Sequence, residues 1–388
     1  MSLYNDASLI MYPSGYKSGK IYCQKPTDGS GDLTFTRAST ATRVNESGLI
    51  EAVASGVPRI DFTGGGCGKL LLEPQRTNIA LYSNNLSDVY YSGASGASIV
   101  LDTNTSPDGT TNASTISFTS STSVYQKILP GDYSNKTWTI SCWVKVGSGS
   151  EGFRFKCTHG GVIDYFSSEK TATTEWQRFT FTVTFSATVG ISIIYGLINS
   201  VSGSSKSIIV YGLQLEEGTY PTSYIPTAGS TVTRVADTSI TIGLSSVINS
   251  VEGVLYAHWK MFANNLTNRF IAISDGTNNN RVFIGYSNVS NRLDVYVVSG
   301  GVMQAAMNYT LTDITVFHKI AIKYKANDFA LWVNGVERAT DVSGSTFASG
   351  TLNSFRLNEG VTISPFYGYI QDLGLFDVST DLAELTTL

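Results

Sequence analysis

Charged residues, histidines and cysteines are scarce in this chain of 388 residues. Only 14% of the residues are charged, and the net charge is -4 without any run of lysine or arginine. Nucleic-acid-binding proteins ordinarily carry a basic patch, so we expect no nucleic-acid partner. The four cysteines include no CxxC pair and are too few for a disulfide framework. Folding in a reducing cytosol is therefore the simpler interpretation.

Long hydrophobic runs are also missing. No stretch of 18 apolar residues occurs, although a membrane-spanning helix needs about that many. The first 20 residues lack a basic segment followed by an apolar run of signal-peptide length. We therefore expect neither membrane insertion nor an export signal.

Serine, threonine, asparagine and glycine are abundant instead, and aromatic residues reach 11% with 21 tyrosines. This composition is typical of twisted sheets with neutral, hydroxyl-rich outer faces. The predicted fold class is all-β, with tandem antiparallel β-sandwiches of the jelly-roll type preceded by an extended N-terminal arm.

The patterning divides the chain into three parts. Residues 1–77 are glycine-rich and irregular, which predicts an arm for attachment or oligomerisation. Residues 78–228 contain regular β-type runs separated by Gly, Ser and Asn clusters, as expected for one sandwich. A connector with Pro221 and Pro226 leads into a second sandwich over residues 229–388.

Alternation within one run predicts which side chains face the core of the first sandwich. In "TWTISCWVKV" one face is apolar, and Trp143 lies on the opposite, polar face. The predicted core residues of this strand are Trp138, Ile140, Cys142, Val144 and Val146.

Two local signals are expected in the second sandwich. Asn334-Gly335 predicts a type I′ hairpin, since both central residues of that turn need positive φ. The closing "STDLAELTTL" is the one expected helix, with Ser379 or Thr380 as its cap.

Arginine recurs where large apolar residues are few, and Thr-Arg-Val occurs twice, at 42–44 and 233–235. Guanidinium groups bind carboxylates through paired hydrogen bonds, and Glu51, Asp61 and Glu73 lie nearby in the sequence. We expect the arginines to hold irregular backbone in place where the chain enters each sandwich, with the last of them paired to Asp237. The predicted structural arginines are Arg37, Arg43, Arg59, Arg76 and Arg234.

Catalytic signatures are not evident. Only three histidines and no G-x-S-x-G motif occur. Glycoside hydrolysis ordinarily needs two carboxylates that face one another, whereas the adjacent Glu216 and Glu217 point to opposite faces of a strand. We therefore predict no catalytic residue, and a glycan depolymerase built from distant acids is the alternative.

One loop offers oxygen ligands for a metal. Asp275, Asn278 and Asn280 lie in "SDGTNNNR", and calcium accepts carboxylate, amide and backbone oxygens. The same string is an ordinary hairpin loop, which is the preferred interpretation. We therefore expect no cofactor, with calcium as the alternative.

Exposed aromatic side chains are candidates for sugar binding, because sugars present apolar C–H faces rimmed by hydroxyl groups. Packing against a strand or a subunit is the preferred interpretation for each candidate. The candidates are Trp143, Tyr90, Tyr91, Tyr256 and Tyr296.

Three strings resemble known families. "FTRASTATRVNESGLIEAV" and the following "LLLEPQRTN" resemble the N-terminal module of bacteriophage virion proteins of the tail-fibre or head-fibre type. "QLEEGTYPTSYIPTAGSTVTRVAD" resembles the end of the carbohydrate-binding-module-like jelly roll in such proteins. Residues 251–388, with "HKIAIKYKANDFALWVNGVE", resemble a concanavalin A-like (laminin G-like) lectin sandwich.

The resemblance implies a virion structural protein, namely a fibre, appendage or decoration subunit that presents lectin-like domains to host-surface glycans. It also implies synthesis in the bacterial cytoplasm, residence in the virion, other virion proteins as partners, and a homo-oligomer, for which a trimer is favoured because it buries open sheet edges. A tailspike-type depolymerase and a purely architectural adaptor are the alternatives.

Overall fold

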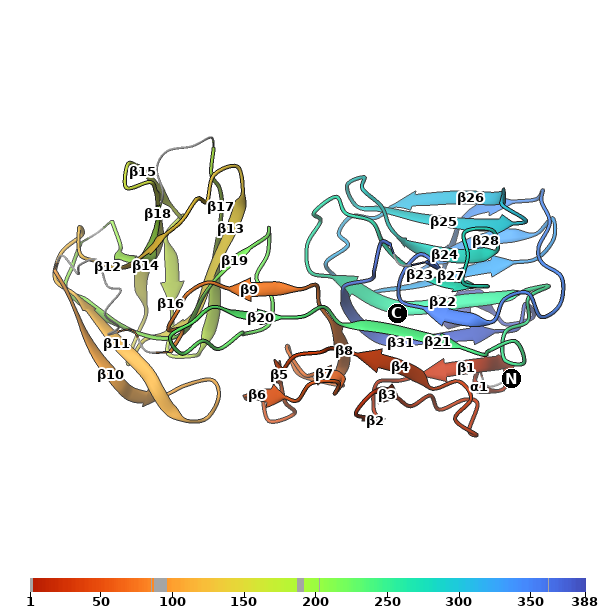
Figure 1. Cartoon of the computed structure of the whole chain (residues 1–388), viewed down its shortest axis with the longest axis horizontal. Helices are drawn as coiled ribbons and strands as arrows, with labels where there is room; N and C mark the ends of the chain where they lie inside the picture. The colour runs from red at the N-terminus through yellow and green to blue at the C-terminus, as the bar shows by residue number, and fades with distance from the viewer. Residues whose placement is uncertain (1–2, 85, 87–95, 187–191, 202, 362) are drawn as a thin grey trace. The chain divides into compact units, whose positions relative to one another are not determined.

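The computed structural model describes residues 3–84, 86, 96–186, 192–201, 203–361 and 363–388 (Figure 1). Clustering of contacts divides the chain into two compact units. Unit 1 comprises Met1–Thr40, Val53–Pro74 and Val235–Leu388, and unit 2 comprises Ala41–Ala52 and Gln75–Arg234. The named strands pair antiparallel and helix is confined to two short segments of the described residues. The all-β prediction is confirmed.

Unit 1 contains strands from both ends of the chain. Its helices are α1 (Leu3–Asp6) and α2 (Leu382–Thr386). Its N-terminal strands are β1 (Ala7–Met11), β2 (Tyr16–Lys17), β3 (Lys20–Ile21), β4 (Leu33–Thr36), β7 (Arg59–Asp61) and β8 (Lys69–Leu72). Its C-terminal strands are β21 (Thr238–Ile242), β22 (Gly253–Met261), β23 (Arg269–Ser274), β24 (Arg281–Tyr286), β25 (Arg292–Ser299), β26 (Val302–Thr310), β27 (His318–Tyr324), β28 (Phe329–Val333), β29 (Val336–Asp341), β30 (Ser354–Arg356) and β31 (Gly368–Phe376).

Two sheets make up unit 1. The eight-stranded sheet has the order β29-β28-β27-β22-β31-β8-β7, with β1 also paired to β31, and the nine-stranded sheet has the order β2-β3-β4-β21-β30-β23-β24-β25-β26. Side chains such as Leu255 and Ile271 from the two sheets share one core. The side of the eight-stranded sheet that faces away from this core is called the outer face below.

The structure divides the chain differently from the predicted boundaries. Residues 1–77 were expected to form a separate arm, but β1 to β4, β7 and β8 are hydrogen-bonded into the two sheets of unit 1 (Figure 1). The physical reason is that strands this short bury little apolar surface alone and gain a core only by joining a larger sheet.

Unit 2 is a second sandwich. Its strands are β5 (Ala41–Val44), β6 (Ile50–Val53), β9 (Arg76–Asn78), β10 (Ala97–Thr105), β11 (Thr111–Phe118), β12 (Val124–Pro130), β13 (Thr137–Lys145), β14 (Glu151–His159), β15 (Ile163–Phe166), β16 (Lys170–Ala172), β17 (Gln177–Thr184), β18 (Ser192–Asn199), β19 (Lys206–Glu217) and β20 (Val232–Arg234). One sheet has the order β10-β11-β19-β13-β17, and the other has β12-β18-β14-β15 with β16 on β14. Unit 2 also contains two two-stranded sheets, β20-β9 and β5-β6.

Local predictions can be compared with these elements. The four predicted inward residues of β13 and Val146, which directly follows this strand, all lie in the core of unit 2, so the alternation is confirmed. Asn334 and Gly335 have φ of 50° and 80° and join β28 to β29, which confirms the hairpin. The predicted helix exists as α2, but the cap is Asp381, whose Oδ1 accepts the Glu384 amide at 3.0 Å. No helix among the described residues has the length and apolarity needed to cross a bilayer.

A buried ion cluster joins the three sequence segments of unit 1. Asp237 accepts hydrogen bonds from Arg37 at 3.1 Å, from Arg59, and from the backbone amide of Glu73 at 2.8 Å. Arg59 also donates to the Glu73 carboxylate at 2.5 Å. These side chains are at most 2% exposed. Burial acts to lower the pKa of Arg59, but the charges of Asp237 and Glu73 outweigh it and raise the pKa.

The predicted pairing of Arg234 with Asp237 stays a prediction, and both residues have other partners. The Asp237 carboxylate is used within unit 1, whereas Arg234 belongs to unit 2 and donates to the hydroxyls of Thr222 and Ser223 at 3.1 and 3.0 Å. Arg234 ends β20, which pairs with β9 inside unit 2.

The remaining predicted arginines lie in unit 2. Arg43 in β5 donates to Glu51 at 2.6 Å. Arg76 in β9 has its Nε 4.0 Å from the buried carboxylate of Glu216. The stabilising role of all five arginines stays a prediction.

Asp237→Asn is expected to lower the free energy of unfolding by about 3–5 kcal/mol, because it removes the charge that compensates two buried guanidinium groups. Asp328→Asn is the matched control in the same unit. It breaks an ion pair with Lys323 in which Asp328 is 50% exposed, so its loss should stay below about 1 kcal/mol. Chemical unfolding of both variants measures the difference, and equal unfolding midpoints would contradict the ion-cluster account.

Candidate functional site

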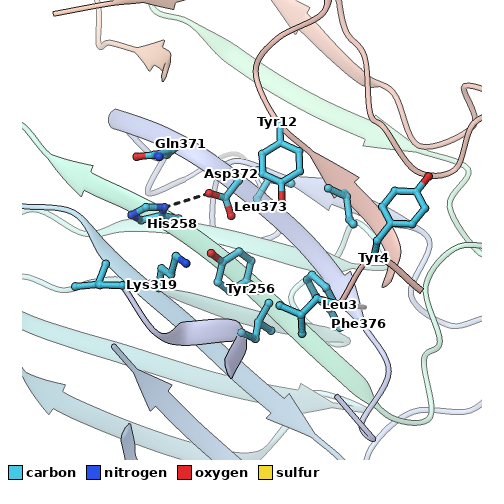
Figure 2. Close-up of a pocket in the computed structure, with 13 residues that line it drawn as sticks. Leu3, Tyr4, Tyr12, Tyr256, His258, Lys319, Gln371, Asp372, Leu373 and Phe376 are labelled. Carbon is cyan, nitrogen blue, oxygen red and sulfur yellow. Dashed lines mark hydrogen bonds and ion pairs between the residues drawn. The ribbon is translucent and has the colours of Figure 1, made fainter. Parts of the chain in front are cut away.

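A pocket of about 420 Å³ lies on the outer face of the eight-stranded sheet. Figure 2 shows its lining residues, which come from α1, β1, β22, β27, β31 and α2. The polar and aromatic lining residues are Tyr4, Tyr12, Tyr256, His258, Lys319, Gln371 and Asp372.

An irregularity in β31 places two of these polar groups together. His258 pairs with Asp372 and Trp259 pairs with Ile370, so Gln371 is an extra residue opposite β22. Such a β-bulge changes the direction in which side chains point. Gln371 and Asp372 therefore both line the pocket, although they are consecutive in the strand.

The other edge of β31 explains why the pocket forms at this point. β8 pairs with Gly368 to Ile370, and β1 pairs with Leu373 to Phe376. The bulge lies between these two stretches of pairing. Two N-terminal strands thus flank the bulge along one edge, and β22 continues along the other.

The Asp372 carboxylate organises the middle of the pocket. It lies 3.1 Å from Nδ1 of His258, as the dashed line in Figure 2 marks. Burial raises the pKa of Tyr256, and the charge of Asp372 and a hydrogen bond to it raise the pKa further. Burial and the charge of Asp372 likewise raise the pKa of Tyr12. The carboxylate therefore interacts with three rings from two segments, namely Tyr256 and His258 of β22 and Tyr12 directly after β1.

Two tyrosines at the pocket rim remain open to solvent, with Tyr4 45% and Tyr12 50% exposed. The Tyr12 backbone is fixed by the Gln24 amide group, which accepts from its N–H at 2.7 Å and donates to its C=O at 3.1 Å. The Tyr4 hydroxyl donates to the Gln24 carbonyl at 3.3 Å, and Nζ of Lys25 lies 5.2 Å from its ring. The Tyr12 backbone and the Tyr4 side chain are thus held in place, while much of both side chains is accessible.

This arrangement can form stacking contacts and hydrogen bonds with one ligand. Aromatic rings offer flat apolar faces, and Gln371, Asp372 and Lys319 offer donors and acceptors. Among the described lining residues Asp372 is the only acidic side chain, whereas ordinary glycoside hydrolysis uses two carboxylates.

Tyr256 is the one predicted aromatic candidate in this pocket. It lies on the outer face, as alternation along β22 predicts, but only 4% of it is exposed. Leu382 and Leu385 of α2 and the ring of Phe376 pack against it. The Tyr256 ring is therefore too buried to stack on a sugar. Tyr256 contributes its hydroxyl group to the pocket, and this hydroxyl is directed at Asp372.

The other aromatic candidates do not line the pocket. Trp143 is half-buried, with the Arg178 guanidinium 4.4 Å from its ring and Tyr211 and Tyr224 at 6.0 and 5.8 Å. These contacts favour the packing interpretation. Tyr90 and Tyr91 lie outside the described residues.

Tyr296 belongs to the opposite sheet of unit 1. It is half-buried on the side of β25 away from the core, and its ring lies 5.0 Å from that of Phe283. Its hydroxyl donates to Asp294 at 3.1 Å, and Arg292 donates to the same carboxylate at 2.9 Å. The Tyr296 side chain is thus engaged in a local cluster apart from the pocket.

Hydrogen bonds from protein groups occupy the oxygens of Asp275 and Asn280 in the calcium candidate loop. Asp275 accepts from the Thr277 amide and from Asn280 Nδ2, both at 2.8 Å. Burial acts to raise the pKa of Asp275, but these hydrogen bonds outweigh it and lower the pKa. Asn280 Oδ1 accepts a hydrogen bond from the Gly300 amide at 2.9 Å. None of these hydrogen bonds involves Asn278. Within the described residues no group of three or more His, Cys, Asp or Glu side chains is placed to hold a metal.

The adjacent glutamates lie as alternation predicts. Glu216 is fully buried and accepts from Thr222, while Glu217 is exposed and pairs with Lys136 at 2.9 Å. They face opposite sides of β19 and do not form a carboxylate pair.

The sequence patterns did not identify most of the pocket, namely Tyr4, Tyr12, Lys319, Gln371 and Asp372. One signal was available. In "GYIQDLGLF" two consecutive polar residues interrupt an otherwise apolar strand, and such an interruption is compatible with a bulge. The contributions of Tyr4 and Tyr12 depend on long-range strand pairing that no local pattern indicates.

Unit 1 has the two-layer sandwich of lectin-like proteins, and the sequence supports that class. Residues 236–386 match the model of the concanavalin A-like lectin/glucanases superfamily. Over these residues, which make up less than half of the chain, the protein is similar to that superfamily. None of the curated proteins matches the chain.

Several solved structures resemble parts of the chain. The CBM40 module of the Ruminococcus gnavus IT-sialidase, bound to alpha2,3 sialyllactose, is 18% identical with a TM-score of 0.32, over 38% of this chain and 91% of that one. Domain 4 of a GH43 extracellular arabinanase from Geobacillus stearothermophilus, in complex with arabinotriose, is 15% identical with a TM-score of 0.31, over 44% of this chain and 82% of that one. Because these TM-scores are low, we rest no inference on these structures.

Asp372→Asn is expected to lower the pKa of Tyr12 towards its ordinary value, because the substitution removes a negative charge that disfavours the phenolate. The 13Cζ resonance of labelled Tyr12, followed by NMR through an alkaline titration, measures this shift. Asp328→Asn is the matched control and should leave the Tyr12 titration unchanged. An unchanged titration in Asp372→Asn would contradict the electrostatic description of the pocket.

Proposed function

We propose that the lectin-like domain binds carbohydrate in the pocket of Figure 2. The observation that carries the proposal is the pair of exposed rings, Tyr4 and Tyr12, beside a bulge that presents an amide and a carboxylate together. Sugars have apolar C–H faces and rims of hydroxyl groups, so they match a site that combines aromatic faces with convergent polar groups.

Each side chain has a distinct role in this proposal. Tyr12 and Tyr4 stack on sugar faces at the rim. Asp372 accepts hydrogen bonds from sugar hydroxyls, and Gln371 both donates and accepts. His258 is oriented by its contact with Asp372 and presents its second ring nitrogen to the ligand. A volume of about 420 Å³ lies within the range of roughly 300–1,000 Å³ usual for small-molecule sites.

Tyr12→Ala is expected to weaken glycan binding about tenfold, the change equivalent to about 1.4 kcal/mol, because it removes one stacking ring. Tyr22→Ala is the matched control, since Tyr22 is also exposed but does not line the pocket. A glycan array identifies ligands of the unmodified protein, and calorimetry compares the variants. Equal losses in both variants, or none in Tyr12→Ala, would refute the assignment of the site.

We further propose that the chain is a structural protein of a bacteriophage virion and presents this domain to host-surface glycan. The support is the resemblance of two strings, "TFTRASTATRVNESGLIEAV" and "QLEEGTYPTSYIPTAGSTVTRVAD", to virion fibre proteins. The neutral, hydroxyl-rich strands of the chain agree with this class of protein. Other virion proteins and a homo-oligomer, with a trimer favoured, belong to the same proposal. The attachment role of residues 1–77 and the carbohydrate-binding-module-like character of residues 78–228 stay predictions.

Antibodies against the purified chain are expected to label intact phage particles in electron micrographs, and light scattering of the chain should give the mass of an oligomer. Particles without label would contradict the virion assignment, and a monodisperse monomer at high concentration would contradict the oligomer. New reducing ends in a host polysaccharide incubated with the chain would instead support the depolymerase alternative.

A further inference from the structure

Beyond the pocket, the same outer face carries a lysine between two aromatic rings. Nζ of Lys260 lies 5.2 Å from the ring centroid of Phe317 and 5.2 Å from that of Tyr369. Its side chain is half-buried, and none of the hydrogen bonds and ion pairs among the described residues satisfies its ammonium group. Such a group has cation–π attraction but lacks the acceptors that a lysine ammonium ordinarily finds in water or in an ion pair.

The position of Lys260 links it to the pocket. It follows His258 by two residues in β22, so both side chains project from the outer face. The two Cα atoms are therefore about 7 Å apart along the strand, a spacing comparable with the length of one pyranose residue. Tyr369, the partner of Lys260 in β31, precedes the bulge residue Gln371 by two positions.

Two further lysines extend the positive charge across neighbouring strands. Lys319 in β27 pairs in register with His258 and donates to the Thr387 carbonyl at 2.8 Å. Lys69 begins β8 and donates to the Gly65 carbonyl at 2.9 Å. Neither of these ammonium contacts involves a carboxylate, so both lysines keep their full charge on a face of a protein whose net charge is -4.

The acidic side chains on this part of the outer face have other partners or are buried. Asp372 is engaged with His258, and Asp61 in β7 is only 2% exposed. Burial lowers the pKa of Lys260, the charge of Lys69 lowers it further, and Asp61 acts in the opposite direction. The protonated form of Lys260 is therefore held in an unfavourable environment that a bound anion would relieve.

We propose that the ligand of this outer face is an acidic oligosaccharide, whose anionic group binds at Lys260 while the neighbouring sugar occupies the pocket of Figure 2. This inference rests on the proposed carbohydrate-binding function and specifies its ligand class. Phe317 and Tyr369 shield the anion from solvent on either side of the ammonium, and Lys69 and Lys319 attract it electrostatically. Carboxylate and sulfate groups both carry the negative charge and the hydrogen-bond acceptors that the Lys260 ammonium requires.

The test compares charged and neutral forms of the same glycans. Polygalacturonate and hyaluronate are each paired with their carboxyl-reduced forms, and dextran sulfate is paired with dextran. The unmodified full chain is expected to bind at least one charged member about tenfold more tightly than its neutral partner in calorimetry. The carboxylate pairs and the sulfate pair distinguish the two sources of negative charge.

Variants then assign the preference to one side chain. Lys260→Met should abolish the preference for the charged member and leave the affinity for the neutral member unchanged, whereas Lys260→Arg should retain the preference. Lys323→Met is the matched control, because Lys323 lies in β27 and its ammonium is already paired with Asp328 at 2.6 Å. Unchanged thermal unfolding of the Lys260 variants shows that they are folded.

Three outcomes would overturn the inference. Equal affinity of the unmodified chain for charged and neutral members, or a preference that survives in Lys260→Met, would reject Lys260 as an anion site while leaving carbohydrate binding intact. An absence of binding to every member, charged or neutral, would reject the proposed function and this inference together.

Discussion

The hydrogen bonding of β31 is the interaction on which the functional surface depends. This strand is paired with β22 along one edge, and with β8 and then β1 along the other. Three distant parts of the sequence are thereby fixed beside one another, and the bulge at Gln371 and Asp372 lies between the two N-terminal strands. Had residues 1–77 formed a separate arm, the bulge would project from an open sheet edge and the rim tyrosines would be elsewhere.

The buried ion cluster around Asp237 acts on the same segments. Removing charges from water is expensive, and a buried ion pair seldom stabilises a fold more than well-packed apolar residues would. Its contribution here is better described as specificity, since Arg37, Arg59, Glu73 and Asp237 come from the three segments of unit 1 and satisfy one another. A different pairing of these segments would leave charges buried without partners.

Alternation and turn chemistry were sufficient to predict the fold class, the inward face of β13 and the Asn334-Gly335 hairpin, because these features depend on neighbours within a few residues. The alternation of side chains along β22 also agrees with the positions of Tyr256 and His258 on the outer face. It did not predict that α2 and Phe376 cover Tyr256, because cover is supplied by segments more than a hundred residues away. Tyr12 enters the pocket through the pairing of β1 with β31, and Arg37 meets Asp237 across 200 residues. Neither contact leaves a local signature in the sequence. The boundaries of the two units and most residues of the candidate site could therefore be identified only from the tertiary structure.

The discontinuous arrangement of unit 1 has a consequence for how the chain is made. Ala7 pairs with Phe376, so a ribosome must synthesise almost all of the printed sequence before the sheet that bears the pocket can close. Residues 75–234 of unit 2 form one continuous stretch and meet no such delay. The early strands of unit 1 therefore keep unpaired edges until their C-terminal partners have been synthesised, and an unpaired strand edge is a site where aggregation can begin.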